Sequence, residues 1–149
     1  MADGLDVIIL DDDPVTCEIL STMVKKFYSW GNVIAFTDIS EATSYCRNQP
    51  TGVAIFIVDV FLDTKTGFDF LEDIESKFPM VYHDTIVITG SASDDVVNMC
   101  IVSDVTYLLE KPIRPHALQF AVRAIVSKYT KFARRLMMDP HFAENVARV

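Results

Sequence analysis

Carboxylates stand directly after two short apolar runs of the chain, and a hydroxyl and an ammonium group stand after two others. Crowded carboxylates repel one another and raise each other's pKa, and a divalent cation removes that repulsion. An oxygen-only set with few protein ligands suits Mg²⁺, which keeps several of its waters. Beside such a cation, one carboxylate could attack a phosphoryl group while the hydroxyl and the ammonium hold the transferred oxygens. The side chains concerned are Asp11, Asp12, Asp13, Asp59, Thr89 and Lys111.

These side chains can meet if the apolar runs before them are strands of one parallel sheet. Continuous runs rich in β-branched residues are typical of strands covered on both faces. Five such runs alternate with five expected helices, and each return between parallel strands needs a crossover, so we predict a single doubly wound α/β domain. Ligands of such sheets bind beyond the carboxyl ends of the strands, where the strand order reverses. The expected strands are 7–10, 33–36, 53–58, 85–89 and 105–109, and the expected helices are 14–27, 38–47, 67–78, 93–102 and 115–138.

Asp13 is better explained as a helix cap than as a site residue, because Pro14 follows it in the first helical turn. Asp38 with Glu41 has the spacing of a capping box. A single Asp, Thr or Lys past a strand end is commonly a turn or cap residue. The full set in this order, after strands one, three, four and five, favours a functional site.

The chain resembles the receiver domain of two-component response regulators over about residues 5–128. The resemblance implies a flavodoxin-like fold of five parallel strands with helices on both faces, and here the last helix is extended. The stretches that carry it are Val7-Ile-Ile-Leu-Asp-Asp-Asp-Pro14, Ile57-Val-Asp59, Gly67-Phe68, Ile86-Val-Ile-Thr-Gly90 and Lys111-Pro112.

The resemblance implies a role for each acidic residue of the set. Asp59 looks like the phosphoacceptor, which takes a phosphoryl group from the phosphohistidine of a histidine kinase or a phosphotransfer protein. Asp11 and Asp12 look like the acidic pair that holds Mg²⁺ together with Asp59 and the backbone carbonyl of Phe61. The chain is then a phosphorylation-controlled switch, which catalyses its own phosphorylation and dephosphorylation and is not a multiple-turnover enzyme.

The hydroxyl and the ammonium have implied roles as well. Thr89 would hydrogen-bond the phosphoryl group, Lys111 would pair with it, and the peptide bond between Lys111 and Pro112 would be cis. Their inward movement would bias the surface of 93–102, 105–109 and 115–138 toward a partner-binding form. Residues on those elements include Met99, Val102, Tyr107, Leu118 and Val122.

Two positions depart from the family pattern. The residue three places before Lys111, usually an aromatic switch residue, is Leu108, and Tyr107 stands one place earlier. Either the strand bulges or Leu108 faces the switch cavity, because a shift of one residue reverses the face of the sheet. Asp63 stands where the family usually has proline, and we interpret it as a solvated residue of a polar loop, 63–66, which adds no ligand to the metal.

The C-terminal part is longer than a receiver domain needs. We expect the receiver domain to span 1–128 and a helical extension to span 129–149, which could be a dimer seam, fold back on the domain or begin a linker. Asp139-Pro140 is expected to break the last helix and leave 142–149 as a final turn or frayed end. The residues of an apolar heptad seam are Leu118, Val122, Ile125, Tyr129, Phe132 and Leu136.

Composition excludes several other classes of protein. A net charge of −8 argues against a broad nucleic-acid footprint, since phosphate contacts need clustered Lys and Arg. The longest apolar run that we find, 53–58, is far too short to span a membrane, and the first residues show no secretory signal. Three cysteines without CxxC spacing indicate reduced thiols, so we expect a cytoplasmic protein.

Two alternative functions remain open at this stage. A haloacid-dehalogenase-like phosphatase would use Asp11 and Asp13 as nucleophile and acid, although Asp59 would then have no role. A receiver-like module that only binds other proteins would have no need of the complete Asp, Thr and Lys set. Labelling with acetyl phosphate would distinguish these possibilities from a phosphoaccepting receiver.

Overall fold

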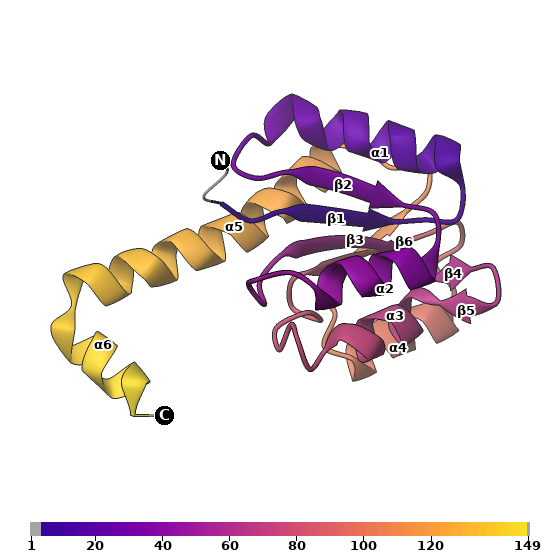
Figure 1. Ribbon diagram of the computed structural model, residues 1–149. Coiled ribbons are helices and arrows are strands. Elements are labelled where there is room, and N and C mark those ends of the chain that lie inside the picture. Colours follow the sequence, from indigo (N-terminus) through magenta and orange to yellow (C-terminus); the bar gives the residue numbers. More distant parts are fainter. Residues whose placement is uncertain (1–3, 149) are drawn as a thin grey trace.

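Five parallel strands joined in one sheet form the centre of the molecule, described by a computed structural model over residues 4–148 (Figure 1). Their order is β2-β1-β3-β6-β7, so the order reverses beside β1, and the predicted flavodoxin-like α/β fold is confirmed. Residues 1–3, used above in the search for a secretory signal, and residue 149 lie outside the described part. The strands are β1 (Val7–Leu10), β2 (Val33–Phe36), β3 (Ile55–Asp59), β6 (Thr85–Thr89) and β7 (Tyr107–Glu110).

Helices cover both faces of the sheet, which explains why its central strands are continuously apolar. In β1, Val7 and Ile9 pack in a cluster with one pair of helices, and Ile8 and Leu10 pack on the opposite face. One pair is α1 (Pro14–Phe27) and α5 (Pro115–Met138), and the other face carries α2 (Ile39–Arg47), α3 (Gly67–Ile74) and α4 (Asp94–Val102).

Three expected elements differ from the structure in their bounds by a few residues. The third strand is 55–59 rather than 53–58, because the ladder continues to Asp59, which pairs with Ile88. The third helix ends at Ile74 rather than residue 78, and beyond it the Glu75 and Lys77 N–H groups donate to carbonyls only three residues back. The fifth strand begins at Tyr107 rather than residue 105, because the preceding segment closes α4.

That closure of α4 is a Schellman-type helix end. Asp104 has a φ of 64°, in the left-handed region, and the Val105 N–H donates to the Cys100 carbonyl at 2.9 Å. The side chains of Val105 and Cys100 belong to the same apolar cluster. Val105 therefore belongs to the turn that closes α4 after Val102, although its β-branched side chain favoured a strand.

An antiparallel hairpin stands where a polar loop was expected. β4 (Phe61–Leu62) pairs with β5 (Lys65–Thr66) around a two-residue turn, Asp63-Thr64. Thr66 and Asp69 then form a reciprocal capping box at the start of α3. The capping box expected at Asp38 is only half made, because Asp38 caps the Ser40 N–H and no bond from Glu41 closes it among residues 4–148.

The C-terminal segment forms a two-helix arm that projects from the body (Figure 1). α5 is continuous across residue 128, so the expected domain division there stays a prediction. The expected frayed end is wrong over its described residues: α6 (Pro140–Ala147) folds back on α5, its Phe142 ring 5.8 Å from that of Phe132. Asp139, which ends α5, also caps α6 by accepting the Phe142 N–H at 3.1 Å. Within 4–148 no helix combines the length and apolarity needed to cross a membrane.

The heptad seam divides into two parts along α5. Its first half, with Leu118 and Val122 fully buried, belongs to the core beneath α1. In its second half Tyr129 still packs against that core, whereas Phe132 is 45% exposed. Of the residues suggested for partner contacts, Leu118 and Val122 are therefore core, whereas Met99 and Val102 are exposed on α4.

The three cysteines are free and buried. Burial raises the pKa of Cys17 to about 11 and that of Cys46 to about 12, so both thiols stay protonated near neutral pH. They pack as small apolar side chains and show none of the thiolate character that reactive cysteines need.

α5 is attached to the body by a carboxylate that sequence reasoning missed. Asp84, just before β6, is 2% exposed, and its two oxygens accept from the Lys128 ammonium and the Tyr129 hydroxyl. Burial and then the hydrogen bond to Asp84 raise the pKa of Tyr129, which keeps its hydroxyl a donor. These two contacts of Asp84 hold α5 against the body at the point where the arm begins.

A Lys128→Ala variant is expected to lose about 2 kcal/mol of unfolding free energy, because a buried carboxylate would lose its counter-charge. Thermal unfolding should shift down by about 4–8 °C for a chain of this size. Lys131→Ala is the matched control, since Lys131 is exposed on the same helix and makes no ion pair within the described range. Equal unfolding temperatures for the two variants would show that the pair adds nothing.

Candidate functional site

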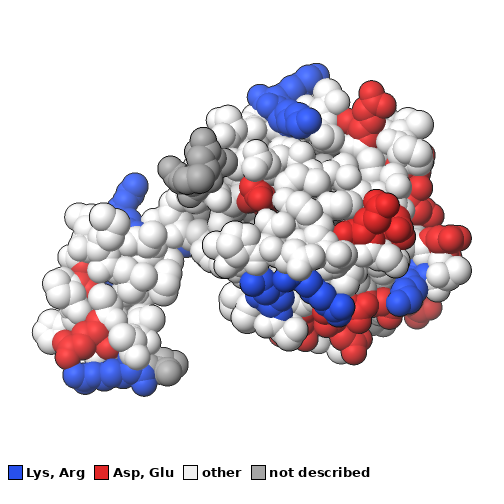
Figure 2. All heavy atoms as spheres, in the orientation of Figure 1, with Lys and Arg blue, Asp and Glu red and all other residues white. Residues whose placement is uncertain are grey.

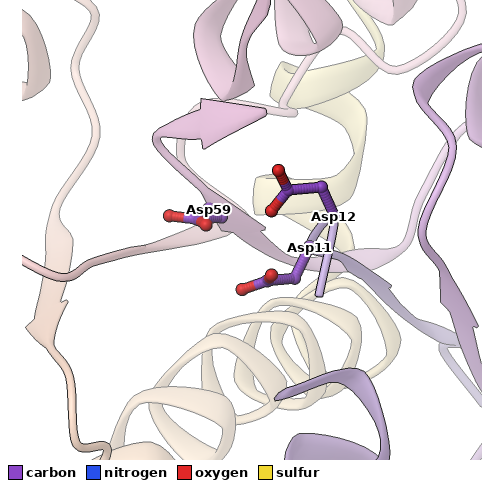
Figure 3. A group of neighbouring side chains, drawn as sticks. All are labelled: Asp11, Asp12 and Asp59. Atoms are coloured by element: carbon purple, nitrogen blue, oxygen red, sulfur yellow. The ribbon is translucent and has the colours of Figure 1, made fainter. Parts of the chain in front are cut away.

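Three carboxylates meet beyond the carboxyl ends of β1 and β3, next to the reversal of strand order. One oxygen each from Asp11, Asp12 and Asp59 lies within 4.8 Å of the others, and the three side chains face a common space (Figure 3). Acidic side chains also gather over the side of the body away from α6 (Figure 2). Asp11 and Asp59 are buried, and Asp12 is exposed.

Lys111, after β7, reaches into this group. Its Nζ donates to Asp11 Oδ2 at 2.8 Å and to Asp59 Oδ2 at 3.1 Å. Its backbone N–H donates to the Thr89 carbonyl at 2.7 Å, so the ends of β6 and β7 are joined at this residue. The peptide bond between Lys111 and Pro112 is cis, as the resemblance implies.

The charges of the group are only partly balanced. Burial raises the pKa of Asp59, the neighbouring Asp11 raises it further, and Lys111 offsets only part of the rise. Burial by itself lowers the pKa of Lys111, but hydrogen bonds to Asp11 and Asp59 outweigh it and leave this pKa raised. An ionised Asp59 is thus costly without a further positive charge.

Thr89 ends β6, the strand that pairs with β3, and its hydroxyl is hydrogen-bonded within the turn that follows. Thr89 Oγ1 donates to the Ser91 carbonyl at 3.0 Å and accepts the Ser91 N–H at 3.2 Å. The side chain is fully buried. To donate to a group on Asp59, the hydroxyl would have to give up its bond to the Ser91 carbonyl.

The pairing of β6 with β7 separates the two candidate switch residues. Val87 pairs with Leu108 and Ile86 with Tyr107, in a register without a bulge. Leu108 packs with the α4 cluster that contains Val87, whereas Tyr107 packs on the opposite face with the cluster of α1 and α5. Leu108, and not Tyr107, therefore lies on the face of the sheet to which Val87 and Thr89 point, and the choice of switch residue stays a prediction.

Asp13 lies outside the group and serves as the cap expected of it. Its side chain accepts the Val15 N–H at 3.1 Å and the Thr16 hydroxyl at 2.8 Å. The hydrogen bonds from Thr16 and then from Val15 lower its pKa. A general acid needs a raised pKa, so Asp13 does not suit the acid role of the phosphatase alternative.

The hairpin contributes a contact that sequence reasoning missed. The Asp63 N–H donates to Asp12 Oδ2 at 3.2 Å, although the Asp63 carboxylate is no member of the metal-binding group. A backbone donor of this kind leaves no signal in the residue type. Phe61, two residues after Asp59, is 61% exposed, and the assignment of its carbonyl as a ligand stays a prediction.

A family model and solved structures match most of this chain. Residues 7–123 match the family model described as response regulator receiver domain. A receiver domain protein from Clostridium thermocellum has 16% identity and a TM-score of 0.74, covering 86% of this chain and 98% of that chain. A CheY-like receiver domain protein from Methanospirillum hungatei has 19% identity and a TM-score of 0.72, covering 87% and 98%. The chemotaxis protein CheY4 of Vibrio cholerae has 19% identity and a TM-score of 0.70, covering 82% and 98%. At these identities the solved structures support the fold alone.

Proposed function

The chain belongs to the response regulator receiver domain family, and on that premise we propose that it accepts a phosphoryl group on Asp59 in a reaction that requires Mg²⁺. The donor is the phosphohistidine of a histidine kinase or of a phosphotransfer protein. The observation that carries the proposal is the cluster of Asp11, Asp12, Asp59 and Lys111 at the reversal of strand order.

The donor set of this cluster fits Mg²⁺. Oxygens bound to one octahedral Mg²⁺ lie at most about 4.2 Å apart, and small side-chain rotations bring oxygens within 4.8 Å to that separation. The ligands would be Asp11, Asp12 and Asp59, with the Phe61 carbonyl and water. Burial of Asp11 and Asp59 beside only one lysine supports a second cation here.

Within the cluster, each side chain has a chemical task. The Asp59 carboxylate forms a bond to phosphorus as the bond from phosphorus to the donor nitrogen breaks. Bound Mg²⁺ would offset the negative charge of the incoming group. Lys111 would exchange its bond to Asp59 Oδ2 for the phosphoryl oxygens, and the Thr89 hydroxyl would turn from Ser91 to the same oxygens.

Phosphorylation would then change the surface of α4, β7 and α5. The Lys111 N–H donates to the Thr89 carbonyl, and the Glu110 carboxylate accepts the Ala92 N–H at 2.9 Å. Because these bonds join the ends of β6 and β7, a movement of Lys111 would displace both strand ends. Exposed apolar residues support a partner surface there: Ile101 is 67% exposed, Val102 85% and Phe120 75%. We propose a second copy of the chain as the partner, with the α5–α6 arm as part of the contact.

The test is incubation of the protein with acetyl phosphate and Mg²⁺, followed by intact-mass measurement. The expected result is a gain of one phosphoryl group that disappears when EDTA is added beforehand. Steady release of phosphate from phosphomonoesters, without a mass gain, would instead support the phosphatase alternative. No mass gain and no turnover would leave only the protein-binding module.

A further inference from the structure

The three carboxylates of the cluster are not held equally. Asp11 is buried, accepts the Asp13 N–H at 2.9 Å on Oδ1 and pairs with Lys111 through Oδ2. Asp59 is also buried and bonded to Lys111. The Asp12 side chain is exposed, and across residues 4–148 its one hydrogen bond comes from the Asp63 N–H. Without that bond, Asp12 would be the one ligand of the three free to rotate.

The hairpin that presents this N–H is fixed at both ends. At its start, the Val60 N–H donates to the Ile88 carbonyl at 3.0 Å, and Leu62 is 4% exposed among the residues beneath α2 and α3. At its end, the Gly67 N–H donates to the Val60 carbonyl at 2.8 Å, and Thr66 caps α3. The Asp63 amide therefore stands on a rigid support.

From these contacts we propose that the β4–β5 hairpin pre-orients Asp12 for the metal through the backbone N–H of Asp63, which makes Asp63 a positioning residue. The inference rests on the proposed binding of Mg²⁺ at this cluster. The N–H uses one oxygen of the Asp12 carboxylate and leaves the other for the cation. Loss of a group that hydrogen-bonds a metal ligand typically lowers metal affinity by about 10–100-fold. Because Asp12 is exposed and accepts one such bond, we expect an effect at the lower end of that range.

Proline at position 63 removes the donor and keeps the hairpin. Asp63 takes the first central position of the turn, where proline is favoured, and its φ is not positive. Leu62 before it is in a strand, the conformation that a residue before proline prefers. Asp63→Ala is the matched control, because it loses the same carboxylate and keeps the N–H.

The experiment measures Mg²⁺ affinity by titration calorimetry on the parent and both variants. Asp63→Pro is expected to bind about tenfold more weakly, and Asp63→Ala within about twofold of the parent. Unfolding temperatures in EDTA should agree for all three proteins, which separates loss of positioning from loss of fold. Equal affinity for parent and proline variants, or an equal loss in both variants, would overturn the proposal.

A second measurement tests the contact without the metal. Amide hydrogen exchange at Asp63 in the EDTA-treated protein is expected to quicken at least several-fold in Asp12→Ala and to stay unchanged in Asp95→Ala, an exposed aspartate of α4. If the parent binds no Mg²⁺ while exchange responds as expected, the proposed function has failed and the contact stands. If exchange at Asp63 does not respond, the positioning role is wrong even where Mg²⁺ binds.

Discussion

An Asp59→Asn variant is expected to gain no phosphoryl group from acetyl phosphate in the presence of Mg²⁺, under conditions in which the parent gains one. An amide cannot supply the carboxylate oxygen that bonds to phosphorus, and no second carboxylate in the cluster is equivalent. Asp11 is buried and already bonded to Lys111 and the Asp13 N–H. Asp12 is exposed and accepts the N–H of Asp63 in the hairpin. Intact mass followed by peptide mapping measures the result.

The same variant carries its own test of folding. Burial and Asp11 both disfavour the ionised form of Asp59, so the neutral amide should raise the unfolding temperature in EDTA. Added Mg²⁺ should stabilise the parent by RT ln(1 + [Mg²⁺]/Kd), and the variant less, because one ligand is lost. Asp95→Asn serves as the control for removal of an exposed carboxylate. Phosphoryl uptake by Asp59→Asn at the parental level would remove Asp59 from the mechanism.

The features that the sequence predicted well depend on patterns repeated over many residues. Continuous apolar runs predicted the five sheet strands, since each strand lies between two layers of helices and shows no alternation. Once the strands were known, the cluster of Asp11, Asp12 and Asp59 followed, because the carboxyl ends of parallel strands share one edge of the sheet.

The features that were missed depend on one or two residues or on distant contacts. Strands β4 and β5 have two residues each, too few to show a period. Asp84 meets Lys128 and Tyr129 across more than 40 positions of sequence, and nothing local marks the pairing. Asp139-Pro140 was expected only to end a helix, yet a cap followed by proline is also the signal that begins one, and here it does both.

A Gly67→Ala variant is expected to lose about 3 kcal/mol of unfolding free energy, the upper part of the range for overpacked positions. A Cβ on Gly67 would lie 2.2 Å from the backbone carbonyl oxygen of Asp59 and 2.7 Å from Val58 Cγ1, whereas real Cβ atoms essentially never approach below 3.0 Å. Relief requires α3 to move from the end of β3, which would also disturb the Gly67 bond to Val60. The expected fall in unfolding temperature is about 6–12 °C.

Gly90→Ala is the matched control for this change, because a Cβ there meets no atom within 4 Å and its φ is not positive. It should unfold within about 0.5 kcal/mol of the parent. Because the atom that Gly67 would strike belongs to Asp59 itself, the larger loss should come with weaker Mg²⁺ binding in Gly67→Ala and not in Gly90→Ala. If both variants unfold at the same temperature as the parent, the stability of the protein does not depend on the close approach of Gly67 to β3. The end of β3 can then shift to accommodate a Cβ at little cost.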